Sequence, residues 1–297
     1  MKIFINMKKN NLLLIALSVI ALFIWTNAGA QATITTRKWK LSDFPQKTTK
    51  IVMTGNEILD QTFKEEAISR WSISPYEFCT LDEFNALKSS TDYYFLMIVK
   101  GQYKKETQPG INLLTLVKGG APKSDSGVNE MYEVISVPFS AVTPGAGREL
   151  IFMPAMIDLM QALITEALNH GLRSDSAVKD YSINITKATN KRILISEDDL
   201  SEKAKAFIGK DFENGLEIVS EDDADSTFTA QPENTLVSYV VAPLEPEKGS
   251  YCYKMLFDAK THQLYYFTKT KASSADKVGF TKGDIATLAS IESKAEN

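Results

Sequence analysis

Histidine and cysteine are scarce in this chain of 297 residues, which contains two of each. His170 and His262 lie far apart, and neither has a cysteine or second histidine nearby, so their spacing fits no zinc motif. His170 falls at the expected C-terminal end of a helix, where the helix dipole favours an imidazolium. His262 lies in "AKTHQ", which is typical of a hairpin turn. The sequence therefore predicts no metal centre and no cofactor.

Familiar catalytic motifs are also missing: the sequence has no G-x-S-x-G turn, no H-E-x-x-H helix and no P-loop. Two S-x-x-K matches occur, Ser176–Lys179 and Ser274–Lys277, but the companion motifs of serine acyl enzymes do not accompany them. "TPGAGRE", which starts at Thr143, has the composition of a flexible connection more than that of an anion-binding cradle. The motifs therefore assign no catalytic residue.

Positive charge is not concentrated along the sequence. The formal net charge is −4, and lysine and arginine are interspersed with acidic residues. A protein that binds nucleic acid without sequence preference needs a dense basic face to displace counterions. The sequence therefore predicts no nucleic-acid partner.

The first thirty residues have the organisation of a signal peptide. Lys8 and Lys9 precede an uninterrupted apolar run from Leu12 to Trp25, which is shorter than the ~20 residues of a membrane span. Ala28 and Ala30 then fit the small-residue pattern that signal peptidase reads. We expect a signal peptide over residues 1–30, with cleavage after Ala30. No cysteine follows the cleavage site, so a lipid anchor is not expected; an uncleaved membrane anchor is the alternative.

The "AGAQ" at this cleavage site resembles the signal-peptide ends of secreted Bacteroidetes proteins, and the remaining chain is similar in character to their uncharacterised envelope proteins. The resemblance implies a secreted or periplasmic protein. It carries no functional residue.

A second apolar segment runs from Leu150 to Leu168. Asp158 and Glu166 interrupt it, and an acidic residue within a membrane span is costly. We therefore expect a buried helix, in which Met153, Met156 and Met160 line a core, and no transmembrane span in the mature chain.

The mature chain contains one pattern of elements twice. In the first unit we expect a strand from Lys50, a helix from Glu57, a strand at "PYEFC", a helix capped by Thr80 and Glu83, three further strands and a helix ending before Gly171. In the second unit, which begins at "KRILIS", the expected helical positions repeat the spacing of the first: Leu59, Phe63, Ala67 and Trp71 correspond to Leu200, Ala204, Ile208 and Phe212. Ser220 and Asp223 likewise stand where Thr80 and Glu83 stand.

The predicted fold class is mixed α/β, with two duplicated lobes of order β-α-β-α-β-β-β-α and a mixed parallel and antiparallel sheet in each. We place the first lobe at residues 31–171, a linker at 172–190 and the second lobe at 191–297. The alternative is that strand-and-helix patterns resemble one another by chance.

Acidic runs at Ser196–Asp199 and Ser220–Asp225 each follow a predicted strand and begin a predicted helix. Acids in a first helical turn complement the helix dipole, which is the favoured interpretation. Calcium binding by Asp222, Asp223 and Asp225 is a minor alternative, because neither run has EF-hand spacing. Asp198 and Asp222 are the carboxylates that we single out for a hydrolase assembled by the fold.

Cys79 and Cys252 leave two possibilities open. In an exported chain they could form a disulfide. They also stand at non-equivalent places of the two units, each in an apolar strand, which slightly favours two buried thiols.

The function expected from these features is that of an exported, non-catalytic binding or assembly protein of the cell envelope with a protein partner. The alternative is a periplasmic protein that binds a small molecule or ion in a cleft between the lobes. A hydrolase that uses carboxylates brought together by the fold is a third, less favoured reading.

Overall fold

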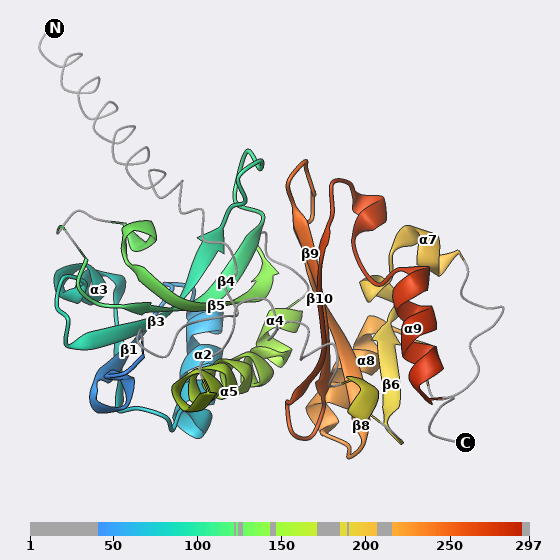
Figure 1. The fold of residues 1–297 in the computed structure, drawn as a ribbon, viewed down its shortest axis with the longest axis horizontal. Helices are drawn as coiled ribbons and strands as arrows, with labels where there is room; N and C mark the ends of the chain where they lie inside the picture. Colours follow the sequence, from blue (N-terminus) through green and yellow to red (C-terminus); the bar gives the residue numbers. More distant parts are fainter. Residues whose placement is uncertain are drawn as a thin grey trace, which may run out of the picture.

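Two five-stranded sheets organise the chain, and helices pack against each of them (Figure 1). The computed structural model describes residues 41–121, 123, 127–142, 147–170, 185–188, 190–206 and 216–292. The predicted signal peptide and cleavage site, and most of the predicted linker, lie outside these residues. None of the helices within them is both long enough and apolar enough to cross a membrane.

The first lobe has the predicted order of elements. Its sheet runs β2-β1-β3-β4-β5; β1 is parallel to β2 and β3, and the remaining pairs are antiparallel. The elements are β1 (Thr48–Val52), α2 (Glu57–Arg70), β2 (Tyr76–Cys79), α3 (Leu81–Leu87), β3 (Tyr93–Gly101), β4 (Ile111–Lys118), β5 (Tyr132–Ala141), α4 (Arg148–Ile151) and α5 (Met153–His170). The helix predicted from Glu57 begins at that residue.

The second lobe repeats this topology. Its sheet runs β7-β6-β8-β9-β10; β6 is parallel to β7 and β8, and the other pairs are antiparallel. The elements are β6 (Arg192–Ser196), the 3₁₀ turn η5 (Glu197–Asp199), α7 (Glu202–Lys205), β7 (Leu216–Val219), α8 (Glu221–Ala230), β8 (Thr235–Val241), β9 (Tyr251–Asp258), β10 (Leu264–Lys271) and α9 (Lys282–Glu292). Strand order and strand directions therefore agree between the lobes, and the predicted mixed α/β fold with two similar lobes is confirmed.

The helix caps predicted at equivalent positions are both present. Thr80 Oγ1 accepts a hydrogen bond from Glu83 N at 3.2 Å, and Glu83 Oε2 accepts one from Thr80 N at 2.7 Å, which completes a capping box at the start of α3. Ser220 Oγ accepts from Asp223 N at 3.1 Å and caps α8. Each cap satisfies an N–H group that the first turn of its helix leaves free.

The predicted helical stripe of the second lobe is wrong at its first position. Leu200 lies outside any helix and bridges to Phe280, because Ser201 N donates to Phe280 O at 3.0 Å and Phe280 N donates to Asp199 O at 2.7 Å. Ser201 then caps the short helix α7. Ile208 and Phe212 lie outside the described residues.

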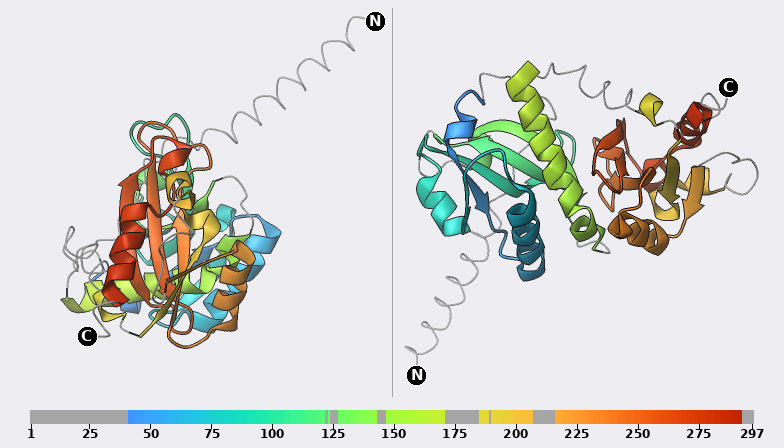
Figure 2. Two further views of the ribbon diagram at one scale, coloured as in Figure 1. Left: turned by 90° about the vertical axis from the view of Figure 1, so that its right-hand side faces the viewer. Right: turned by 90° about the horizontal axis from the view of Figure 1, so that it is seen from below.

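Helices cover the two sheets in the same way. In the first lobe α2 and α5 pack together on one face, and α3 covers part of the other (Figure 2). In the second lobe α7 and α9 share one face and α8 lies on the opposite face. The face that carries α8 is turned toward the first lobe, and the largest hydrophobic cluster runs through both lobes. As predicted, Met153, Met156 and Met160 are buried in this core.

Candidate functional site

The junction between the lobes is built around the ring of Phe152, the residue between α4 and α5. This ring stacks on Phe228 of α8 at a centroid distance of 4.1 Å and on Tyr239 of β8 at 4.3 Å. The hydroxyl of Tyr239 donates a hydrogen bond to Phe139 O of β5 at 2.6 Å. Side chains from both lobes thus fill the space around Phe152, and stacked rings fix the lobes against each other.

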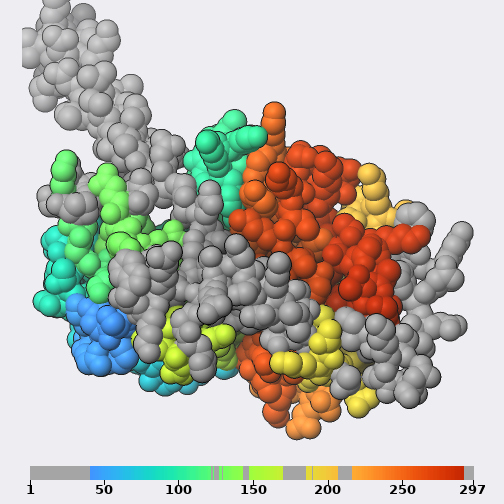
Figure 3. All heavy atoms as spheres, viewed as in Figure 1, coloured from blue at the N-terminus to red at the C-terminus, as the bar shows by residue number. Residues whose placement is uncertain are grey.

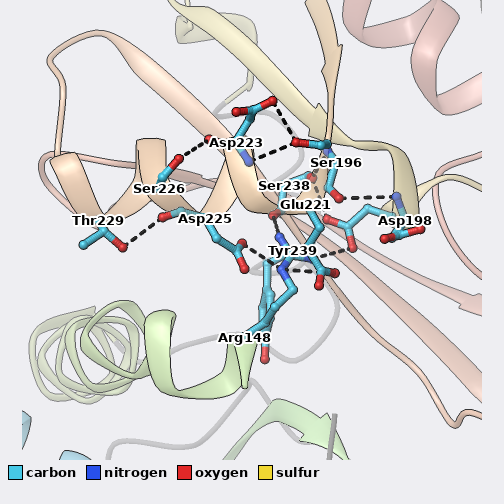
Figure 4. Close-up of polar contacts among 12 residues, drawn as sticks. Arg148, Ser196, Asp198, Glu221, Asp223, Asp225, Ser226, Thr229, Ser238 and Tyr239 are labelled. Carbon is cyan, nitrogen blue, oxygen red and sulfur yellow. Dashed lines mark hydrogen bonds and ion pairs between the residues drawn. The ribbon is translucent and has the colours of Figure 1, made fainter. Parts of the chain in front are cut away.

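Arg148 extends from the first lobe into the second (Figure 4). It follows Gly147, whose φ of +91° favours glycine, and it begins α4. Its Nε donates to Asp225 Oδ1 at 2.8 Å, its Nη1 to Asp199 Oδ1 at 3.0 Å and its Nη2 to Ser238 O at 3.1 Å. Arg148 is only 8% exposed. It therefore joins a turn, a helix and a strand of the second lobe to the first.

Asp199 has both carboxylate oxygens bound within this cluster. Oδ1 accepts from Arg148, and Oδ2 accepts from the Ser238 hydroxyl at 2.5 Å. The Ser238 hydroxyl in turn accepts from Ser196 N at 2.9 Å. Because Asp199 is 3% exposed, these bonds replace the water that its charge would otherwise require.

Negative charge is in excess around Arg148. Burial alone would lower the pKa of Arg148, but the charges of Asp199 and Asp225 outweigh burial and raise it. Burial raises the pKa of Asp225, and the attraction of Arg148 only partly opposes this. Burial likewise raises the pKa of Glu221, whose Oε2 is 3.7 Å from Arg148 Nε. One cation is thus shared among three carboxylates.

An open hollow of about 530 Å³ adjoins this cluster along α8. It is lined by Ile151, Glu221, Asp222, Asp225, Ser226, Thr229 and Ala230. A positive charge placed in the hollow would stabilise the ionised forms of carboxylates whose pKa burial has raised. Its chemistry therefore suits an ammonium or guanidinium group.

A second polar contact joins the lobes at His262. This residue lies in the turn between β9 and β10, as predicted, and has a φ of +57°, yet it is only 4% exposed. Its Nδ1 is 2.8 Å from Asp158 Oδ2 of α5 and 3.3 Å from Arg70 Nη1 of α2. Its ring packs on Phe228 at 5.4 Å. His262 therefore connects the β9–β10 hairpin of the second lobe to helices α2 and α5 of the first lobe.

The acids considered for calcium take separate roles. Asp223 accepts from the Ser220 hydroxyl at 2.7 Å at the helix cap, Asp225 binds Arg148, and Asp222 lines the hollow. Within the part of the chain that the structure describes, no three His, Cys, Asp or Glu side chains are arranged to hold a metal ion.

The carboxylates singled out for a hydrolase, Asp198 and Asp222, are not those that the fold gathers. Asp198 lies 3.7 Å from Lys205 Nζ. The carboxylates that meet at Arg148 are instead Asp199, Asp225 and Glu221.

The two cysteines are free thiols, Cys79 in the first sheet and Cys252 in the second, and both are buried. Burial raises the pKa of each thiol to about 11. The disulfide that the sequence left open is not formed, and the reactive thiolate is disfavoured at neutral pH.

The remaining candidates form no catalytic pair in the described residues. His170 ends α5, but its side chain lies outside the description, as does Ser176–Lys179. Lys277 Nζ donates to Ser273 Oγ at 3.0 Å, whereas the Ser274 hydroxyl donates to Asp276 at 2.5 Å.

Sequence reasoning missed Arg148, the centre of the junction. The available signal was an arginine in "GAGRE", directly after Gly147 and a few residues before a long apolar segment. A charged residue at the border of a buried segment needs a partner, but the sequence does not say which carboxylate provides it.

No protein-family model matches this chain, and no curated protein or solved structure matches it significantly.

Proposed function

We propose that this chain is an exported, non-catalytic binding or assembly protein of the bacterial cell envelope, and that a protein partner places a basic side chain in the hollow beside α8. The observation that carries the proposal is the excess of carboxylates around Arg148 at the rim of a well-packed junction. Export rests on the predicted signal peptide and on the resemblance of its cleavage site to those of Bacteroidetes proteins.

The form of the hollow favours a protein side chain as its occupant. Sites for small ligands bury most of the ligand surface in a cleft, whereas this hollow is open. A lysine or arginine on a partner would bring its charge to Glu221 and Asp225 and leave the rest of the partner to contact the surrounding surface.

Two other functions each have one observation in their favour. A volume of about 530 Å³ also fits a small amine or cation, as in a periplasmic small-molecule-binding protein. Glu221 and Asp225 line one hollow and both have a raised pKa, as a hydrolase acid would.

The test is in-cell crosslinking followed by purification of the tagged chain from its own bacterium. The hollow variant Glu221→Gln/Asp222→Asn is compared with the control variant Glu130→Gln/Glu233→Gln, which removes two exposed acids elsewhere. We expect one recurrent, stoichiometric protein with the wild type and the control, and several-fold less with the hollow variant.

Recovery of the tagged chain alone would refute the proposal. A thermal-shift screen then distinguishes the alternatives: stabilisation by lysine, arginine or putrescine that is lost in the hollow variant supports small-molecule binding.

A further inference from the structure

Two connections at equivalent places in the lobes lie side by side at one end of the junction: residues 102–110 between β3 and β4, and residues 242–250 between β8 and β9 (Figures 1 and 3). Thr107 N and Oγ1 donate to Glu247 Oε1 at 2.6 and 3.0 Å. The contact is close: a Cβ on Gly249 would fall 2.6 Å from Lys105 Cβ. The two connections therefore hold each other in place.

Lys269 of β10 lies beside these connections, above three tyrosine rings. Its Nζ is 4.8 Å from the ring centre of Tyr103, 4.3 Å from that of Tyr251 and 5.5 Å from that of Tyr253. The side chain keeps solvent access, and partial burial among the rings lowers its pKa. No carboxylate in the described residues pairs with it. Lys269 is thus a positioned cation without an anionic partner among the residues that the structure describes.

Four further exposed lysines belong to the same two connections or to β10. Lys104 and Lys105 lie in the first connection and Lys248 in the second, while Lys271 pairs in register with Tyr251. Together with Lys269 and Leu244 they form what we name the tip surface. None of its five lysines forms an ion pair with a described carboxylate.

Several lysines elsewhere in the described chain form ion pairs. Lys50 binds Glu77, Lys118 binds Asp43, Lys191 binds Asp258 and Lys254 binds Asp284. The same two connections also carry Glu106, Glu245 and Glu247; Glu106 is buried and Glu247 accepts from Thr107. The five exposed lysines outnumber these acids, so the tip surface has a net positive charge in a chain whose net charge is −4. This concentration is invisible in the sequence, because three separate segments contribute to it.

We propose that the tip surface docks an acidic segment of a protein partner. Charge complementarity selects the sign of the partner, and ordered lysines lose less side-chain entropy on binding. Leu244, which is 60% exposed, supplies an apolar contact beside the charges. Tyr103 and Tyr253 are 4% and 1% exposed. Tyr251 is partly exposed, but Lys269 and Tyr103 contact its ring, so the three rings offer no open face for the sugars of an anionic glycan. These features favour a peptide.

This inference rests on the proposed role as a binding protein but not on the hollow, whose charge is opposite. A protein with an acidic hollow and a basic tip surface could bridge two partners, or two parts of one. The two sites are tested by different variants.

The probe is a fluorescent decaglutamate peptide, titrated with the full mature chain by anisotropy at low and at physiological salt. The tip variant Lys269→Gln/Lys271→Gln is compared with Lys64→Gln/Lys260→Gln, which removes two exposed lysines elsewhere. We expect binding that weakens with salt and a loss of about three- to tenfold in affinity in the tip variant only. Equal losses in both variants, or no binding by the wild type, would overturn the inference, as would tighter and equally tip-dependent binding of dextran sulfate.

The crosslinking experiment separates this inference from the proposed function. If the tip variant and the wild type recover the same partner in equal amount, the tip surface fails while the binding function stands. If the wild type recovers no partner but decaglutamate binds the tip surface, the proposed envelope function fails while the tip surface stands as a site for acidic peptides.

Discussion

At the scale of single residues, Arg148 is the centre of a cluster of buried charges whose desolvation costs free energy. A buried ion-pair cluster is not strongly stabilising in itself, because desolvation offsets most of the attraction. Removing one member is a different matter, since the others stay buried without compensation. Asp199, which is 3% exposed, would then keep only the hydrogen bond from Ser238.

We therefore expect Arg148→Met to lower the free energy of unfolding by about 3–5 kcal/mol, measured by urea denaturation at pH 7. Arg192→Met is the matched control, because the Arg192–Glu217 pair is exposed and should contribute about 1 kcal/mol or less. Equal, small effects of both substitutions would contradict the role assigned to Arg148.

The pH dependence of stability should include a contribution from Asp43. Burial alone would raise the pKa of this carboxyl, but hydrogen bonds from Lys118, Lys47 and Tyr94 outweigh burial and hold the pKa well below its usual range. A carboxyl whose pKa is lower in the folded chain stabilises it above the unfolded pKa of about 3.9, and this stabilisation is lost as the pH falls toward the folded pKa.

Asp43→Asn should accordingly be less stable than the wild type at pH 7, and the difference should shrink as the pH is lowered from about 5 to about 2. Urea denaturation of both proteins at a series of pH values measures it. A difference that stays constant over this range would show that Asp43 does not titrate with a lowered pKa.

At the scale of elements, local sequence determined most of what could be predicted. Most strands are rich in apolar, aromatic or β-branched residues, and the helices after β2 and β7 carry their own caps. The helix predicted over Leu200 failed because residues 199–201 pair with the distant residue Phe280. Local helix propensity contains no information about a partner so distant in the sequence.

The cap of α8 should be worth about 1 kcal/mol, so Ser220→Ala should lower the free energy of unfolding by that amount. Ser226→Ala is the control in the same helix: Ser226 is an exposed interior residue, and alanine is the better helix former. We expect Ser226→Ala to be neutral or slightly stabilising in urea denaturation. Destabilisation of equal size by both would remove the assignment of Ser220 as the cap.

The same limit applies to the candidate site. The sequence drew attention to the acidic helix starts that contain Asp199, Glu221 and Asp225, but it could not say which acids face inward. Arg148 and His262 acquire their roles only through contacts with residues far away in the chain. Repeated topology was predictable because each lobe contains its own signals; the contact between the lobes was not.

At the scale of the whole molecule, the two lobes have one topology but different surroundings. The face of the second sheet that carries α8 packs on the first lobe, through the stacked rings around Phe152 and through Arg148. Two further contacts, at His262 and between the paired connections, extend the junction in both directions. The hollow and the tip surface both lie along this junction. Both binding proposals therefore require that the lobes keep a fixed position relative to each other.

Differential scanning calorimetry of the mature chain tests this central claim most directly. Because a shared core and buried ion pairs couple the lobes, we predict one unfolding transition whose calorimetric and van 't Hoff enthalpies agree. Two separate transitions, each with about half of the total enthalpy, would show that the lobes unfold independently and would contradict a rigid junction.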